Sequence, residues 1–344
     1  MMKLTNRTPD FNQFVKVLKG EATTRPVMFE FILGEDKEQW LVGDEYDVSS
    51  ELKRNITRIK AFRNAGYDFC PILIKGAAFY RQADEHKNVH TKSLNTGAVI
   101  TNRESFNSYQ WPDVKACDFS LLEQLVPYLE GGMKLIPYSY DGVLENAIGV
   151  VGYENLCYML YDDEELLADV FHKIGEITEA YYDKCLPYRS VGAILCNDDW
   201  GFNSQTMLPP QTLRKYVFPW YQRIVAKAHK DSKYALVHSC GYYRDIISDM
   251  TDTIRFDGKH SFEDNIIPVE KAYEELTGKI AVLGGIDMNF LKTKSPQEVY
   301  ARSKALIHQT KKGGYALGSG NSITDYIPIE NYSAMLKAGL EDYE

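Results

Sequence analysis

Several features are missing from this 344-residue sequence, and each absence narrows the kind of protein it can be. No stretch approaches the roughly 20 consecutive apolar residues of a membrane-spanning helix. The first residues contain no apolar run of the kind found in signal peptides, which favours a cytoplasmic location. Basic charge is in deficit, because 39 Lys and Arg face 48 Asp and Glu, for a formal net charge of -9. A chain with this charge is a poor binder of phosphate backbones, so we expect neither a nucleic-acid partner nor a membrane partner.

Cysteine is also scarce, and its spacing contains no CxxC pair. A chain of this length does not need disulfides to stabilise its core. We therefore expect a reducing environment and mostly buried cysteines. The six are Cys70, Cys117, Cys157, Cys185, Cys196 and Cys240.

Eight short β-rich runs alternate with amphipathic stretches along the chain. Most of these runs are apolar on both alternating faces, as expected of strands covered on both sides by helices. Strict alternation through eight strands predicts an α/β fold, a single (β/α)8 TIM barrel that spans residues 1–344 as one domain. The runs are residues 25–33, 67–74, 134–140, 192–198, 234–240, 253–262, 279–286 and 314–320.

The stretches between the runs carry helix signals. Ser295 and Pro296 predict the N-cap and first turn of one helix, which should end near a Gly pair. Pro219 lies inside another amphipathic stretch that we expect to be one long helix. The clearest helical stretches are residues 49–66, 121–132, 163–186, 208–231 and 295–314.

One segment interrupts the alternation. Residues 75–121 carry Gly, Asn, Ser and scattered aromatic residues. We interpret this segment as an insertion after the second strand, on the rim that holds the active sites of such barrels.

Polar side chains that could form a site stand at the carboxyl ends of the predicted strands. This end of a barrel carries the active site, so these side chains are the first candidates. They include Glu30, Tyr140, Asn197, Asp198, Asp199, His238, Cys240, His260, Asp287, Ser319 and Asn321.

His238 and Cys240 form the sharpest pattern among them. Residues i and i+2 of an extended chain point to the same face, and imidazole and thiolate are good zinc ligands. The alternative is a buried cysteine beside a histidine that is hydrogen-bonded to the backbone.

The run Asn197-Asp198-Asp199 could supply a general base, a metal ligand or a substrate anchor. The alternative is a strand end whose acids cap a following segment. We assign catalysis to Asp199 first, because it lies nearer the rim, and then to Asp198 and His260. Substrate binding is assigned to Tyr140, Asn197, Asp287 and Ser319.

The sequence resembles the uroporphyrinogen decarboxylase superfamily, in blocks that extend over essentially the whole chain. The resemblance implies a TIM barrel. The blocks are residues 11–30, 109–113, 196–225, 234–250, 281–291, 313–323 and 327–339.

Within this superfamily, true uroporphyrinogen decarboxylases have an arginine-rich stretch after the first strand that grips a substrate with eight carboxylates. Here the corresponding residues 29–40 are acidic and contain no arginine. An acidic segment in a chain of net charge -9 would repel a polycarboxylate. Porphyrinogen decarboxylation is therefore not expected.

The sequence is instead similar to the cobalamin-dependent methyltransferases of the superfamily, such as methylcobalamin:coenzyme M methyltransferases. That resemblance implies a zinc held by His-x-Cys and by a cysteine near the last strand. His238 and Cys240 match the first part. Ser319 occupies the position of the second cysteine, and no cysteine follows Cys240. A carboxylate is then expected to complete the site, with Glu30 preferred and Asp198 or Asp199 next.

The resemblance implies a zinc-dependent transfer of a methyl group between a small O- or N-methylated substrate, or a thiol acceptor, and a corrinoid. A ligand set with one thiolate leaves a more electrophilic zinc, which favours an oxygen substrate. The chain contains no corrinoid-binding DxHxxG motif, so the corrinoid (cobalamin) is expected on a separate partner protein. The alternatives are a metal-independent decarboxylase or lyase of the same barrel, and a catalytically silent barrel that binds a ligand or a corrinoid protein.

Overall fold

The sheet is built from parallel strands that follow one another in chain order. The computed structural model describes residues 5–81, 94–95 and 97–343, and within these residues seven strands pair as β1-β2-β3-β4-β5-β6-β7. Every pairing is parallel, which confirms the predicted α/β class. The strands are β1 (Phe69–Leu73), β2 (Lys134–Tyr138), β3 (Ala193–Asn197), β4 (Tyr234–His238), β5 (Gly258–His260), β6 (Ala281–Leu283) and β7 (Tyr315–Ala316).

The first predicted run, residues 25–33, does not form a strand. It makes two isolated parallel bridges beside β7, Met28 to Leu317 and Leu33 to Ile323. Five residues separate the bridge positions on one segment and six on the other, so the register shifts between them and no ladder can continue. The expected eighth strand is therefore reduced to a bridged segment, because a ladder needs a constant register.

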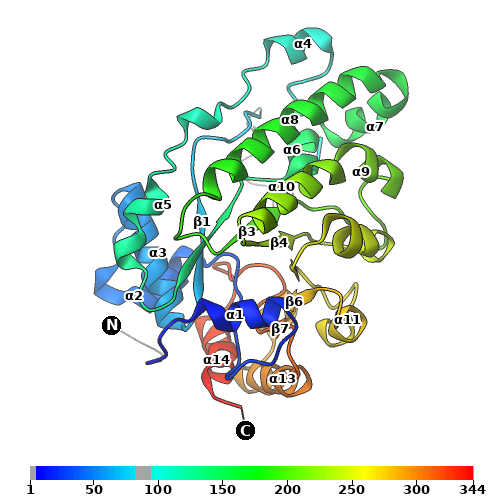
Figure 1. Cartoon of the computed structure of the whole chain (residues 1–344). Coiled ribbons are helices and arrows are strands. Elements are labelled where there is room, and N and C mark those ends of the chain that lie inside the picture. The colour runs from blue at the N-terminus through cyan, green and yellow to red at the C-terminus, as the bar shows by residue number, and fades with distance from the viewer. Residues whose placement is uncertain (1–4, 82–93, 96, 344) are drawn as a thin grey trace.

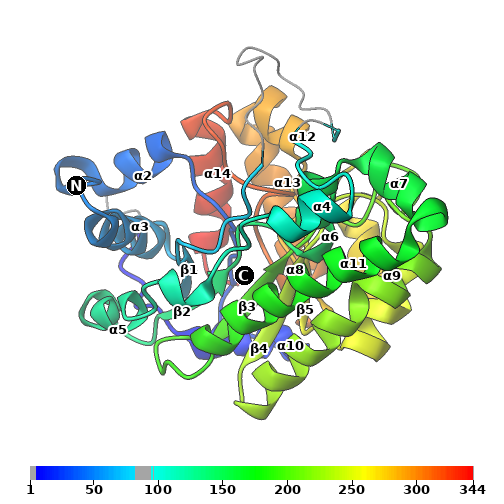
Figure 2. The same ribbon diagram turned by 90° about the horizontal axis from the view of Figure 1, so that it is seen from above.

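Helices surround the curved sheet on its outer side, as Figures 1 and 2 show. The α-helices are α1 (Phe11–Leu18), α2 (Glu35–Val42), α3 (Glu51–Ala65), α4 (Arg103–Ser108), α5 (Leu121–Gln124), α6 (Val143–Val151), α7 (Tyr153–Asp162), α8 (Glu164–Cys185), α9 (Pro210–Tyr216), α10 (Phe218–Lys230), α11 (Val269–Leu276), α12 (Met288–Thr293), α13 (Pro296–Gln309) and α14 (Ile329–Leu340). Shorter helical turns are η1 (Gly43–Glu45), η2 (Val114–Ala116), η3 (Val126–Tyr128), η4 (Arg244–Ile246) and the π-helical η5 (Asp249–Ile254).

Local sequence signals explain where several helices begin and end. Ser295 caps α13 by accepting from the backbone N–H of Glu298, and Pro296 occupies the first turn, as predicted. The stretch 208–231 is two helices rather than one. It breaks at Val217, because Pro219 has no N–H to donate to the carbonyl oxygen of Lys215 four residues earlier, and its ring would clash with that carbonyl.

Two apolar cores lie on the two faces of the sheet. Phe14, Phe29, Phe69, Leu195 and Leu236 belong to the inner core, inside the curved sheet. The outer core lies between the sheet and the surrounding helices.

Helix α1 closes the amino-terminal end of the curved sheet (Figure 1). Asp10 bridges Gly132, just before β2. The Phe11 ring lies so close to Gly192, just before β3, that a Cβ there would come within 2.6 Å of it. The interior is therefore filled at this end, which leaves the carboxyl ends of the strands for a site.

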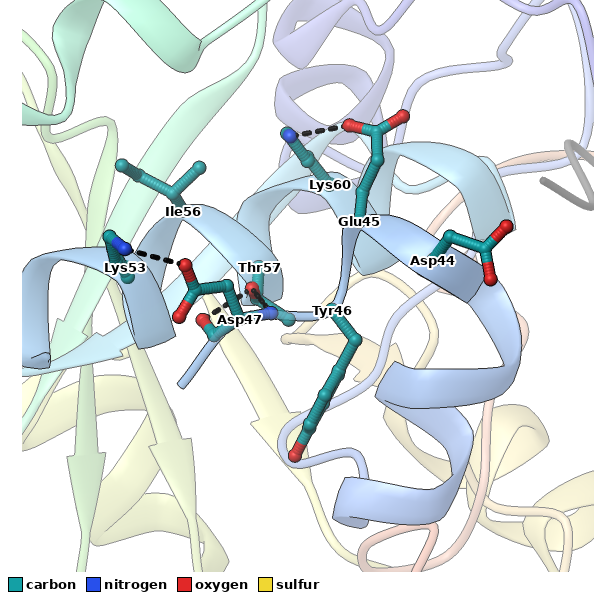
Figure 3. Close-up of a pocket in the computed structure, with 8 residues that line it drawn as sticks. All are labelled: Asp44, Glu45, Tyr46, Asp47, Lys53, Ile56, Thr57 and Lys60. Atoms are coloured by element: carbon teal, nitrogen blue, oxygen red, sulfur yellow. Dashed lines mark hydrogen bonds and ion pairs between the residues drawn. The ribbon is translucent and has the colours of Figure 1, made fainter. Parts of the chain in front are cut away.

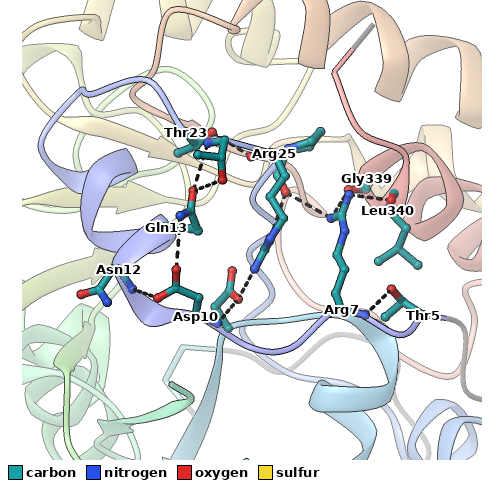
Figure 4. Close-up of polar contacts among 12 residues, drawn as sticks. Thr5, Arg7, Asp10, Asn12, Gln13, Thr23, Arg25, Gly339 and Leu340 are labelled. Carbon is teal, nitrogen blue, oxygen red and sulfur yellow. Dashed lines mark hydrogen bonds and ion pairs between the residues drawn. The ribbon is translucent and has the colours of Figure 1, made fainter. Parts of the chain in front are cut away.

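The segment before α1 is tied to residues far along the chain (Figure 4). The Arg7 guanidinium donates to the carbonyl oxygens of Gly339, at 2.8 Å, and Leu340, at 2.5 Å. Nearby, the buried Asp68 carboxylate accepts from Arg25 at 2.5 Å and from the backbone N–H of Asp10 at 2.8 Å. These bonds fix the position of α1 against the start of β1.

The segment predicted as a rim insertion follows β1. Residues 82–93 and 96 lie outside the described residues. The described part contains α4 and η2, and the ring of Trp111 packs edge-on against Phe79 and Phe106. That this segment forms the rim of the site stays a prediction.

No helix in the described part of the chain combines the length and the apolar character needed to cross a membrane. All six cysteines are free, and four of them are buried.

Candidate metal centre

Three side chains that could bind a metal meet at the carboxyl ends of β3 and β4. Asp199, His238 and Cys240 each offer one ligand atom, and these atoms all lie within 4.8 Å of one another. The His238 Nε2 and the Cys240 Sγ are 3.5 Å apart. We call these three residues the cluster.

Strand alternation explains why His238 and Cys240 face the same way. Leu236 of β4 points into the inner core, while Ala235 and Val237 point to the outer core. His238 follows Leu236 by two positions, and the side chain of Cys240 approaches its ring.

Two loops in close contact bring Asp199 to this pair. Gly241 has φ +83, and a Cβ on it would lie 2.1 Å from the Gly201 carbonyl oxygen. Only glycine therefore allows the loops after β3 and β4 to pack this tightly. In this arrangement the Asp199 Oδ1 accepts a 2.7 Å hydrogen bond from the backbone N–H of Cys240.

Burial shapes the protonation of the cluster. Burial, and then the charges of His260 and Lys259, lower the pKa of His238 well below its usual value. Burial, and then the Asp199 charge, raise the pKa of the Cys240 thiol well above its usual value. The Asn321 side-chain amide lies 3.2 Å from the Cys240 Sγ and donates to it. The free site therefore holds a neutral imidazole and a thiol, and a metal ion would have to displace the thiol proton.

The donor set fits zinc. In a tetrahedral zinc site with the usual Zn–S and Zn–N bond lengths, the nitrogen and sulfur ligands lie about 3.5 Å apart. The His238 Nε2 and the Cys240 Sγ show this separation. With a carboxylate as third ligand, the set leaves a fourth position open for substrate, as catalytic zinc sites do.

Glu30, the preferred third ligand from sequence, is not part of the cluster. Phe29 and Phe31 point into the inner core, so the intervening Glu30 points outward. Its carboxylate accepts 2.7 and 3.2 Å hydrogen bonds from the Ser319 hydroxyl and backbone N–H. Burial raises the pKa of Glu30 to about 8. The structure thus places Asp199, rather than Glu30, beside His238 and Cys240.

Asp198 faces away from the cluster and caps a helix. It is fully buried, and its carboxylate accepts from the backbone N–H groups of Leu144 and Glu145, in the first turn of α6. It also accepts from the Trp200 indole and the Tyr221 hydroxyl, each at 2.8 Å. Burial raises its pKa to about 7. Asp198 thus has a capping role, but on α6, which precedes β3 in the chain, and not on the following segment that the sequence suggested.

The remaining predicted residues lie at different depths around the cluster. Asn197 pairs with His238 in the sheet, and His238 pairs with His260. Tyr140 is 36% exposed and lines a small cavity with Asp141. Asp287 caps α12 by accepting from the backbone N–H of Phe290. The structure therefore places His260 and Asn197 beside the cluster, and Asp287 in a capping role.

Sequence reasoning missed two charged residues near the cluster. Lys259 is fully buried on β5, where its ammonium donates to the carbonyl oxygens of Ser239 and Ser261. Burial lowers its pKa to about 8. Its signal was a lone lysine inside a predicted strand. Glu145 lies in the first turn of α6, and burial followed by the Asp199 and Asp198 charges raises its pKa well above the usual value.

A cavity of about 400 Å³ lies on another part of the surface, between η1 and α3 (Figure 3). Two of the acids that line it are paired with lysines, Asp47 with Lys53 at 2.7 Å and Glu45 with Lys60 at 2.5 Å. None of the predicted site residues lines it.

Comparison with solved structures shows the same fold in proteins of low sequence identity. A methyltransferase from Methanosarcina mazei superposes with a TM-score of 0.69 at 17% identity, over 96% of this chain and 98% of that chain. A B12-independent methionine synthase from Shewanella sp. W3-18-1, in complex with selenomethionine, gives a TM-score of 0.53 at 11% identity, over 92% and 96% of the two chains.

No curated protein matches the sequence significantly. The family model described as uroporphyrinogen decarboxylase (URO-D) matches residues 142–341, which is more than half of the chain and includes every member of the cluster. The chain therefore belongs to the uroporphyrinogen decarboxylase family.

Proposed function

We propose that the protein is a zinc-dependent methyltransferase. It moves a methyl group between a small O- or N-methylated substrate, or a thiol acceptor, and a corrinoid cofactor on a separate protein. The observation that carries this proposal is the cluster of Asp199, His238 and Cys240, whose ligand atoms lie within 4.8 Å of one another at the carboxyl ends of the strands. The shared fold with a methyltransferase supports it.

Asp199, His238 and Cys240 would hold the metal. Zinc bound there would supply Lewis acidity, which polarises the oxygen of a methyl ether or alcohol or lowers the pKa of a bound thiol. The Asn321 amide, 3.2 Å from the Cys240 Sγ, would stabilise the thiolate by donating a hydrogen bond to it. The backbone N–H of Cys240 holds the Asp199 carboxylate against the pair.

The donor set favours an oxygen substrate. One thiolate, one imidazole and one carboxylate form a harder set than one with two thiolates, since carboxylate oxygens donate less electron density than sulfur. Ser319 cannot supply a second thiolate, and its hydroxyl is already bonded to Glu30. A methoxylated compound is therefore the first substrate class to test.

The test combines metal analysis with a methyl-transfer assay. The purified protein is loaded with zinc and mixed with a reduced corrinoid and single methoxylated or methylated compounds, and methylation of the cobalt is followed by its absorbance. We expect transfer from at least one methoxylated compound by the wild type and none by Cys240→Ser. Zinc-free wild type that turns over a substrate by decarboxylation would contradict the proposal.

A further inference from the structure

A continuous chain of hydrogen bonds runs through the barrel interior to the cluster. The His260 Nε2 lies 3.1 Å from the Ser319 carbonyl oxygen. The Nδ1 atoms of His260 and His238 are 2.8 Å apart. The chain ends where the His238 Nε2 meets the Cys240 Sγ. Both rings are buried, at 0% and 5% exposure for His260 and His238.

The direction of each bond follows from what its atoms can do. A carbonyl oxygen can only accept, so the His260 Nε2 must carry a proton and donate a hydrogen bond to the Ser319 carbonyl oxygen. In a neutral imidazole the other nitrogen then has a lone pair, so the His260 Nδ1 accepts. The His238 Nδ1 must therefore donate, and the His238 Nε2 is left with a free lone pair that faces Cys240.

The surroundings keep both rings neutral and hold them in place. The Phe29 ring lies 4.8 Å from the His260 ring, and the Phe31 ring lies 4.8 Å from the His238 ring, between centroids. A Cβ on Gly284 would come within 3.0 Å of the His260 Nε2, so backbone packs against this edge of the ring. A buried, charged imidazole in such an apolar setting would be costly.

We infer that His260 is a positioning residue that holds His238 as the Nδ1–H tautomer and aims the His238 Nε2 at a metal ion. The metal part of this inference rests on the proposed function, whereas the tautomer belongs to the free protein. Partners of this kind fix the orientation of a metal-binding histidine and typically change metal affinity by about 10–100-fold when they are removed.

The first measurement is made on the metal-free wild type. Two-bond ¹H–¹⁵N spectra of protein labelled at histidine nitrogens distinguish the two neutral tautomers. We expect His238 as the Nδ1–H form and His260 as the Nε2–H form. A His238 signal of the Nε2–H form overturns the inference, whether or not the protein binds zinc.

The second measurement uses three substitutions of His260. The Oδ1 of asparagine reaches the position of the His260 Nδ1, so His260→Asn can still accept from His238. His260→Gln keeps only the contact with Ser319, and His260→Phe keeps neither. We expect His260→Asn to retain most of the zinc affinity, and the other two to lose about 10–100-fold in competition with a chromophoric chelator.

The outcomes separate this inference from the proposed function. Wild type without measurable zinc affinity contradicts the proposed function, and the tautomer then decides the inference alone. Wild type that binds zinc with equal affinity in all three variants overturns the inference and leaves the metal site intact. Circular dichroism and thermal unfolding identify any variant that fails to fold, and such a variant leaves the decision to the spectra of the wild type.

Discussion

Within the described residues, Cys240 differs from the other cysteines in having a histidine nitrogen within 3.5 Å of its sulfur. Elemental analysis of protein purified with zinc is expected to find about one zinc per chain, and Cys240→Ser should lose most of it because serine is a poor zinc ligand. Cys157→Ser, at a half-buried cysteine on α7, is the matched control and should keep its zinc. An unchanged zinc content in Cys240→Ser would contradict the role of Cys240 as a zinc ligand.

Asp199 and Asp198 are neighbours in the chain, yet only Asp199 reaches the cluster. Asp199→Asn removes a charged ligand and should weaken zinc binding by at least about tenfold, since an amide is a poorer zinc ligand than a carboxylate. Asp198→Asn is the control and should bind zinc as the wild type does. If Asp199→Asn keeps its zinc while methyl transfer falls by about 10²–10⁴, the residue is a general base instead.

Glu30 makes the stability of the protein depend on pH. Burial raises its folded pKa from 4.5 to about 8, so between these values the folded state holds a proton that the unfolded chain releases. The free energy of unfolding is therefore highest, as far as Glu30 is concerned, below pH 4.5. It falls by about 1.4 kcal/mol for each pH unit as the pH rises from 4.5 towards 8. Urea unfolding measured at pH 5.5 and at pH 8 should show that the free energy of unfolding falls less between these two values in Glu30→Gln than in the wild type. An equal loss in both would show that Glu30 does not titrate.

Which side chains meet at the site could be predicted from the sequence only where strand alternation decides the direction of a side chain. His238 and Cys240 could be paired from their spacing alone, because both lie on one extended segment. The Asp199 contact could not, since it depends on two loops that meet at Gly201 and Gly241. Glu30 was predicted as the third metal ligand but does not join the cluster. The alternating pattern Phe29-Glu30-Phe31 shows that Glu30 faces away from the two rings, but the sequence does not tell which of the two faces lies inside.

Helix α6 depends on an acid from another element for its N-cap. Its N-cap residue, Gly142, has no capping side chain, and Asp198 supplies the acceptor from the end of β3. Asp198→Ala also leaves the Trp200 indole and the Tyr221 hydroxyl without this partner. We expect a loss of about 3 kcal/mol in the free energy of unfolding.

The control for this substitution is Asp163→Ala. Asp163 caps α8 through a bond to the backbone N–H of Leu166, and its loss should cost about 1 kcal/mol. Chemical denaturation of both variants gives the comparison. Equal losses would contradict the role of Asp198 as the anchor of α6.

Whole elements were predicted well where their signals are local. The capped helices α3, α8 and α13 lie where the sequence indicated, and all seven strands fall inside predicted runs. The first run failed because its pairing with β7 depends on register. There the Ser319 N–H donates to the Glu30 side chain instead of to a backbone carbonyl oxygen of a neighbouring strand.

The charge of the whole molecule opposes a polycarboxylate substrate. Residues 29–40 contain no arginine, and the net charge is -9. The basic groups near this segment are already paired, Arg58 with Glu38 and Arg54 with Glu35. We expect no decarboxylation of uroporphyrinogen, because bidentate arginine contacts are the natural means of holding its carboxylates. Coproporphyrinogen, measured by chromatography and formed in proportion to enzyme concentration, would contradict this.

The bonds from Arg7 to Gly339 and Leu340 also bear on the order in which the molecule is made. The joined residues are 332 and 333 positions apart, and a ribosome adds about 5–20 residues each second. The segment that leads into α1 must therefore wait about 15–70 s for its partners at the end of α14 to be synthesised. Until then the buried face of α1, which includes Phe11, Phe14 and Val17, has only an incomplete sheet to pack against, so the nascent chain keeps exposed some apolar side chains that the finished fold buries.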